Sequence, residues 1–210
     1  MSEKKLHKKK EQGAETRKKL YDCAKQLFTE HDYASVSVKN ITDAAGVTKG
    51  TFYVHFESKY ALVASLIAVS AAQLDLEYKT FLNTLPPDMP VSGVLLALTE
   101  KIAAVISETV GYETMKAVYQ MQLTRTVNVE GMKSYSRELY HLICGILEQG
   151  IRRGELKTTL PPQVLSRHLV MALRGLCYEW CIRYPDFDLK EQAVEHTRLL
   201  IDGIAKSTIN

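Results

Sequence analysis

The stretch Ser37-Val-Lys-Asn-Ile-Thr-Asp-Ala-Ala-Gly-Val47, continued by Thr48-Lys-Gly-Thr-Phe-Tyr-Val-His-Phe-Glu-Ser-Lys59, decides the fold of the first part of this 210-residue chain. It predicts two short helices joined by a tight turn. Ser37 and Thr48 are good N-caps, because their hydroxyl oxygens can accept hydrogen bonds from free backbone N–H groups. Gly46 can adopt the left-handed conformation that ends a helix. The pattern is typical of a helix–turn–helix, whose second helix enters the major groove of DNA.

The second of these helices is aromatic on one side and polar on the other. Phe52 and Phe56, at i, i+4 spacing, predict the face that packs into a core. Gly50 costs about 1 kcal/mol relative to alanine inside a helix, and it permits close approach of the backbone to a partner. The alternative is an ordinary amphipathic helix whose polar face is only solvated.

The segment from Thr16 to about Leu66 resembles the DNA-binding domain of the TetR family of bacterial transcription regulators. The matching residues follow one another at the family's spacing: Ala24, Leu27, Phe28, Ser37-Val38, Ile41, Ala45-Gly46-Val47, Lys49-Gly50-Thr51-Phe52-Tyr53, His55-Phe56, Ser58-Lys59 and Leu62. Two positions depart from the pattern, because Val54 stands where a second aromatic is common and Tyr60 where an acid is common. These departures bear on packing against the fourth helix, not on the positions expected to meet DNA.

The expected DNA contacts lie mainly on the second helix of the motif. Lysine can donate to guanine O6 and N7, and the threonine methyl can pack on a thymine methyl, so Lys49 and Thr51 are expected to read bases. Tyr53 and His55 are expected to hydrogen-bond phosphate, which fixes register. The expected set also contains helix-start groups and outlying cations: Arg17, Ser37, Lys39, Asn40, Thr48, Gly50 and Lys59.

The sequence predicts an all-α fold with a three-helix N-terminal head and a larger helical body, about nine helices in all. Helices are expected over 16–31, 38–45, 49–56, 58–84, 91–110, 112–126, 130–153, 162–184 and 189–207. The expected division is a basic, disordered tail over 1–15, a DNA-binding domain over 16–60 and an effector-binding and dimerisation domain over 61–210. The long fourth helix joins the last two domains.

Charge is unevenly distributed along the chain. Residues 1–60 carry 12 Lys or Arg and eight Asp or Glu, whereas residues 61–210 carry 15 and 16. The basic excess therefore falls on the segment expected to meet phosphate. The lysine-rich residues 1–15 are interpreted either as an arm that contacts phosphate or as a solubilising tail. No apolar run follows them, and the longest uncharged stretch, 60–74, is shorter than a membrane span, so a cytoplasmic protein without a membrane partner is expected.

The last two predicted helices carry apolar stripes that must be covered. The resemblance implies that these helices pair with a second copy, and a homodimer would place two reading helices about 34 Å apart on a palindromic operator. The stripe residues expected at this interface are Leu165, Leu169, Ala172, Leu173, Leu176, Val194, Thr197, Ile201 and Ile204. The alternative is that both stripes face the subunit's own core.

The resemblance also implies an effector pocket in the body, for a small molecule that the sequence does not identify. Candidate lining residues are Met and aromatic or histidine side chains at helical spacing: Tyr78, Phe81, Met115, Tyr119, Met121, His141, Tyr178 and Trp180. Such a set is more often core than pocket. Three arginines lie in otherwise apolar stretches, Arg125, Arg137 and Arg174. One of them could hold an anionic ligand; the alternatives are an internal salt bridge or exposure at the surface.

The four cysteines form no C-x-x-C motif. Cys177 with Cys181, or His141 with Cys144, could supply two metal ligands, but small buried hydrophobes are the commoner role of free cysteine. No cofactor or metal is expected. Common catalytic motifs are absent, so an enzyme is not expected. A ligand-released homodimeric repressor is the leading hypothesis; a sequence-tolerant DNA-binding structural protein and a metal- or thiol-sensing repressor remain as alternatives.

Overall fold

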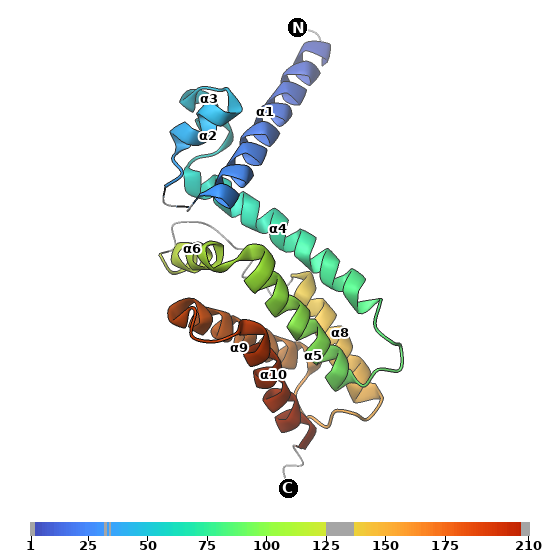
Figure 1. The fold of residues 1–210 in the computed structure, drawn as a ribbon. Coiled ribbons are helices and arrows are strands. Elements are labelled where there is room, and N and C mark those ends of the chain that lie inside the picture. The colour runs from blue at the N-terminus through green and yellow to red at the C-terminus, as the bar shows by residue number, and fades with distance from the viewer. Residues whose placement is uncertain (1–2, 32, 34, 125–136, 207–210) are drawn as a thin grey trace. The chain divides into compact units, whose positions relative to one another are not determined.

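A computed structural model describes residues 3–31, 33, 35–124 and 137–206, which contain helices and no β-strand (Figure 1). The all-α expectation is therefore confirmed. The elements are α1 (Glu3–Glu30), α2 (Val38–Ala45), α3 (Lys49–His55), α4 (Lys59–Leu82), α5 (Val91–Ala104), the π-helix η1 (Val105–Val110), α6 (Tyr112–Leu123), α8 (Glu138–Arg152), α9 (Pro162–Arg183) and α10 (Leu189–Lys206).

The N-terminus differs from the expectation. Residues 3–15 were expected to be a disordered tail, but α1 begins at Glu3 and runs without a break to Glu30. This segment contains Lys, Glu, Gln, Leu and Ala, which favour helix, and it contains no proline. His7 Nδ1 also lies 3.2 Å from Glu11 Oε1, one helical turn away. Because the segment lacks the 3.6-residue apolar pattern, sequence periodicity alone does not reveal this helix.

The chain divides into two compact units, of which the first comprises described residues 3–69 with 120–124 and the second residues 70–119 with 137–206. The first unit thus extends to Val69, whereas the sequence placed the boundary after residue 60. In this unit, called the head below, α1, α2 and α3 pack against one another around a small apolar core. That core comprises Leu20, Ala24, Val36, Ile41, Ala45, Phe52, Phe56, Leu62 and Leu66.

The second unit, called the body below, contains α5, α8, α9 and α10 packed as neighbours (Figure 1). Its main core takes residues from α4, α5, α8, α9 and α10, with Leu98 and Leu147 fully buried. A smaller cluster gathers around Trp180, which packs edge-on to Tyr112 and Tyr184. Pro162 opens α9 in its first turn, where proline is tolerated, as the sequence predicts.

Two ion pairs join α4 to the start of α8 within the body. Arg137, which precedes α8, binds Asp75 of α4 in a bidentate arrangement, with Nε 2.9 Å from Oδ2 and Nη2 2.6 Å from Oδ1. Both side chains are largely buried, with 15% and 5% of their surfaces exposed. A second pair, Lys79 with Glu138, is exposed and longer, at 3.5 Å. Arg137 therefore forms the internal salt bridge that the sequence analysis kept as one alternative, and Arg125 lies outside the described residues.

Helix α4 is long and apolar enough, by length and composition, to cross a membrane, and among the described residues it is the one helix that meets this test. A core helix of a soluble protein meets the same test, so this is weak evidence. The buried Asp75–Arg137 pair at its C-terminal half shows that part of α4 belongs to the body's interior.

Candidate nucleic-acid interface

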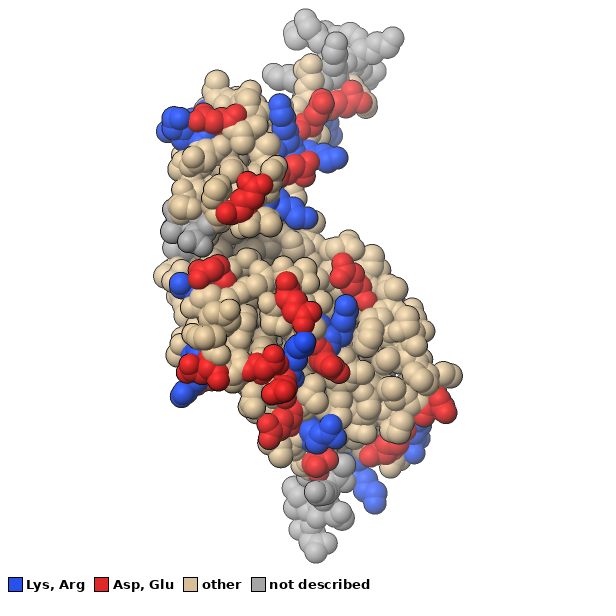
Figure 2. All heavy atoms as spheres, viewed as in Figure 1, with Lys and Arg blue, Asp and Glu red and all other residues tan. Residues whose placement is uncertain are grey.

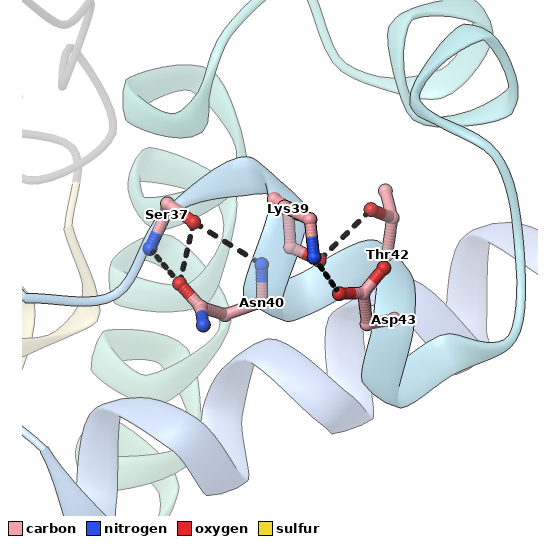
Figure 3. Close-up of polar contacts among 5 residues, drawn as sticks. All are labelled: Ser37, Lys39, Asn40, Thr42 and Asp43. Atoms are coloured by element: carbon pink, nitrogen blue, oxygen red, sulfur yellow. Dashed lines mark hydrogen bonds and ion pairs between the residues drawn. The ribbon is translucent and has the colours of Figure 1, made fainter.

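Helix α2 begins with a reciprocal capping arrangement (Figure 3). The Asn40 backbone N–H donates to Ser37 Oγ at 3.2 Å, and the Ser37 backbone N–H donates to Asn40 Oδ1 at 2.8 Å. The Ser37 hydroxyl also donates to Asn40 Oδ1. Two otherwise free donors at the helix start are thereby satisfied, which fixes where α2 begins. Ser37 Oγ and Asn40 Oδ1 are both engaged in these bonds, and both residues are exposed.

The turn between α2 and α3 is fixed by Gly46, which has φ 61° and ψ 37°. This left-handed conformation is the one predicted for it, and it lets Val47 N–H donate to Thr42 O at 3.0 Å. Lys39 is exposed and pairs with Asp43 one turn later, with Nζ 2.7 Å from Oδ2. This exposed pair is easily exchanged for a phosphate, because exposed ion pairs contribute little to stability.

Helix α3 is held by its cap and by one deeply buried ring. Thr48 Oγ1 accepts from Thr51 N–H at 3.2 Å and lies 3.0 Å from Thr51 Oγ1. Phe52 is fully buried and packs against Phe56 at a centroid separation of 5.7 Å. The opposite side of α3 is open, since Lys49, Gly50 and Tyr53 are exposed. Of the residues expected to read bases, Thr51 is half-buried with its hydroxyl engaged, so Lys49 is the more available.

Val54 is the residue on this face that the sequence analysis missed. It is 80% exposed and lies beside Tyr53, four residues after Gly50. The sequence analysis linked Val54 to helix packing because the resembling family often has an aromatic there. The signal that could have identified it is the helical period: Phe52 and Phe56 mark the core face, and Gly50, Tyr53 and Val54 fall opposite. The two exposed methyl groups of Val54 are chemically suited to contact a thymine methyl.

The outlying residues of the expected set lie at the edges of α3. His55 is half-buried at the end of α3, on the side facing α1. Arg17 of α1 is exposed and its guanidinium carbon lies 4.8 Å from the Phe56 ring centroid, so the side chain is partly ordered by a cation–π contact.

Lys59 is half-buried and makes contacts within the head. Its ammonium donates to the Tyr33 carbonyl oxygen, lies 3.8 Å from the Tyr33 ring centroid and 5.8 Å from that of Phe28. Burial lowers the pKa of Lys59 below its ordinary value of 10.5. Because this cation is engaged inside the head, it is less available to a phosphate than an exposed lysine. The contact depends on tertiary structure and has no signal in the sequence.

The residues expected to line an effector pocket separate into two groups. Trp180 lies in the smaller body cluster, where Met115 and Tyr119 pack against it, and Tyr178 meets Tyr119 edge-on with centroids 5.3 Å apart. Tyr119 also donates from its hydroxyl to Arg174 O at 2.9 Å. The remaining four are not part of this cluster: Tyr78 is buried in the main body core, Met121 is buried, Phe81 is half-buried and His141 is exposed.

The residues expected at a dimer interface are buried or partly covered within the subunit's own fold, and their pairing with a second copy stays a prediction. Leu165, Leu169 and Ile201 belong to the main core of the body, and Thr197 is also buried. The others are partly covered within the same chain: Ala172, Leu173, Leu176, Val194 and Ile204. The reason is geometric, because these stripes face α5, α8 and each other within one body.

The cysteine thiols of the body have raised pKa values, which makes them poor nucleophiles and poor metal ligands. Burial raises the pKa of Cys177 to about 12 and that of Cys181 to about 11. Burial and Glu148 also raise the pKa of Cys144. A high pKa leaves little thiolate, the form that reacts and binds metal. Within the described ranges, no three His, Cys, Asp or Glu side chains gather as a metal site would require.

The face drawn in Figure 2 shows acidic and basic side chains intermixed over the body.

Comparison with known proteins shows that the head is similar to a family of bacterial regulatory proteins. A family model described as "Bacterial regulatory proteins, tetR family" matches residues 20–66. The HTH-type transcriptional regulator AcrR of Shigella flexneri is 27% identical over 206 residues, covering 93% of this chain and 92% of that protein. The fatty acid metabolism regulator protein of Bacillus subtilis is 26% identical over 192 residues, covering 88% and 93%.

Solved structures share the fold over nearly the whole chain. Thermus thermophilus FadR, a TetR-family repressor in complex with lauroyl-CoA, has a TM-score of 0.70 and 22% identity, covering 90% of this chain and 94% of its own. A TetR-family regulator from Pectobacterium atrosepticum has a TM-score of 0.75 and 19% identity, covering 93% and 97%. The similarity therefore includes the body as well as the head.

Proposed function

We propose that the chain is a TetR-family transcriptional regulator, and specifically a homodimeric repressor that a small-molecule effector releases from a palindromic operator. The observation that carries the proposal is α3. This helix is anchored by the fully buried Phe52 and presents Lys49, Tyr53 and Val54 outward. An anchored helix with an exposed, mixed polar and apolar face has the form needed to enter a major groove.

The exposed residues of α3 divide into two proposed roles. Lys49 and Val54 read bases, the first by donating to guanine and the second by contact with a thymine methyl. Tyr53, Lys39, Arg17 and the Asn40 amide hold phosphates and fix the register of the helix. The remaining residues of the expected set act indirectly, since Ser37 and Thr48 shape the helix starts, and Gly50 allows the backbone to approach.

Selection of bound duplexes from a random DNA pool, at about 150 mM salt, tests this proposal. The expected result is a palindrome whose half-sites are about one helical turn apart. Lys49→Ala should then change which sequence is enriched, whereas Lys39→Ala should weaken all sequences and lower the salt slope by about one unit per contact. Similar affinity for every duplex, with a steep salt slope, would replace the proposal by a sequence-tolerant DNA-binding protein.

A second copy of the chain is the proposed partner of an exposed apolar face on α9 and α10. On α9 this face carries Met171, Tyr178 and Ile182, and on α10 it carries Leu199, which is 66% exposed. A Cβ added at the neighbouring Gly175 or Gly203 would meet nothing within 4 Å, so the backbones there are open to close approach. An exposed apolar face on two adjacent helices is a typical interaction surface.

Sedimentation of matched leucine variants tests this face. Leu199→Glu should shift the protein from dimer to monomer, because a carboxylate would be buried without a partner. Leu160→Glu is the control, since Leu160 is also exposed but precedes α9. A dimer that survives Leu199→Glu as well as it survives Leu160→Glu would place the interface elsewhere.

The effector is proposed to bind in the body, beside the aromatic cluster of Met115, Tyr119, Tyr178 and Trp180. Two relatives of known structure were solved with acyl-CoA ligands, lauroyl-CoA in one and stearoyl-CoA in the other. These two compounds, with free CoA as the control, are therefore the first probes for release from the selected duplex. Release by the acyl thioesters and not by CoA would identify the acyl chain as the recognised group; no release by either would exclude this class.

A further inference from the structure

The first turns of α1 form a basic helix that extends the head's DNA-binding surface. We propose that residues 3–12, called the arm below, bind the phosphate backbone of the DNA that flanks each half-site. The inference rests on the proposed function, since it concerns the same DNA complex. It adds a contact surface outside the helix–turn–helix itself and commits to duplex phosphate as the partner.

The arm carries a concentrated, net positive charge. Residues 3–12 contain five lysines and two glutamates. As a helix with a rise of about 1.5 Å per residue, the arm is about 15 Å long. One DNA strand presents a phosphate about every 3.4 Å along the axis, so the arm can run beside about four phosphates. This complementarity of charge and length selects duplex DNA among possible partners.

The arm continues a surface that already lies against the reading helix. Lys10, Gly13, Arg17 and Leu20 follow at three-, four- and three-residue intervals, so they share one side of α1. On that side Leu20 is buried in the head core, and Arg17 lies over the Phe56 ring.

A Cβ added at Gly13 would lie 3.9 Å from His55 Cε1, at the end of α3. The row therefore runs beside α3, and Lys10 continues it one turn beyond.

Because the arm is already helical, we expect it to bind DNA more tightly than a disordered tail of the same charge. A backbone that is already helical loses less conformational entropy on binding than a disordered tail does. Gly13 is the weak point of this helix, because glycine disfavours helix relative to alanine. Steric crowding does not require glycine at this position, since an added Cβ would lie at an ordinary van der Waals distance of 3.9 Å from His55 Cε1. Substitutions at Gly13 can thus change the order of the arm without changing its charge.

The closing experiment measures the dependence of affinity on salt, using the selected palindrome in duplexes with about 3 or about 12 flanking base pairs on each side. Replacing Lys4, Lys5, Lys8, Lys9 and Lys10 together by glutamine removes the charge. If two lysines in each of two arms release counterions, the slope of log K against log salt falls by about four units, at about 0.9 per contact. The loss should appear on the long duplex and be small on the short one. Lys157→Gln, in the body, is the charge control.

The Gly13 pair tests the helix separately. Gly13→Ala should tighten binding to the long duplex by up to about fivefold. Gly13→Pro should weaken it, because proline removes the hydrogen bond to residue 9 yet is tolerated as the first residue of a shortened α1. Circular dichroism checks that both variants keep a folded head.

The outcomes separate the two proposals. An unchanged slope in the five-lysine variant, with the palindrome still bound, overturns the arm alone. Equal loss on short and long duplexes also overturns it, because the charge would then act within the half-site. If the wild-type protein enriches no duplex, the proposed function itself fails, and the arm inference falls with it.

Discussion

The buried Asp75–Arg137 pair permits a quantitative prediction about what holds α4 to the body. Asp75→Leu leaves the Arg137 guanidinium in the interior without its bidentate partner, and Arg137→Met leaves the Asp75 carboxylate there alone. Removing one partner of a buried pair costs about 3–5 kcal/mol, whereas replacing both by apolar side chains is often neutral. Each single variant is therefore expected to lose about 3 kcal/mol, and the double variant about 1 kcal/mol or less. The same two helices offer a control in Lys79→Met, since the Lys79–Glu138 pair is exposed and should contribute less than about 1 kcal/mol.

Urea unfolding followed by circular dichroism measures these differences, with protomer concentration fixed because dimerisation alters apparent stability. With an m-value of about 2–3 kcal/mol/M, a loss of 3 kcal/mol lowers the midpoint by about 1–1.5 M. The double-mutant cycle then gives the coupling between the two side chains. If the double variant loses as much as the two single variants together, the reasoning from burial and bidentate geometry is refuted.

Three further outcomes are expected. Lys59→Met should weaken DNA binding by a similar factor at every salt concentration, because its ammonium is engaged with Tyr33; a salt slope reduced by about one unit per protomer would restore a phosphate contact. Ser37→Ala should cost about 1 kcal/mol in equilibrium unfolding, because the capping arrangement of α2 is lost; an unchanged midpoint would contradict this. Cys177 and Cys181 should resist a thiol-reactive dye at pH 8 in the folded protein, because their pKa values are raised to about 12 and about 11. Since the folded pKa values lie above the unfolded value of about 9, stability should fall as pH rises past 9, and rapid labelling at pH 8 would overturn both statements.

The helix–turn–helix could be predicted from sequence because its signals are local. Ser37 and Thr48 cap the two helices, Gly46 takes the left-handed turn, and Phe52 with Phe56 marks the core side. Each signal involves residues at most four positions apart, so a pattern of residue types is enough to define it. The bounds of α2 agree with the prediction, and α3 ends one residue earlier than predicted.

Three features of the structure were not predicted from the sequence, because local residue patterns did not reveal them. Lys59 looks like any other exposed lysine until the chain folds Tyr33 and Phe28 around it. The helix over residues 3–15 has no apolar period, so it gives no pattern to detect. Val54 was linked to helix packing because the resembling family often has an aromatic residue at that position. Its spacing from Phe52 nevertheless places it on the side of α3 opposite the core.

Helices α9 and α10 show why an apolar stripe is not by itself an interface. Each helix packs an apolar stripe into the subunit's own core, with Leu169 and Ile201 buried there. The other side leaves Ile182 and Leu199 exposed. An apolar stripe can thus serve the subunit's own core, and the dimer proposal rests on the apolar residues of the same two helices that this packing leaves uncovered.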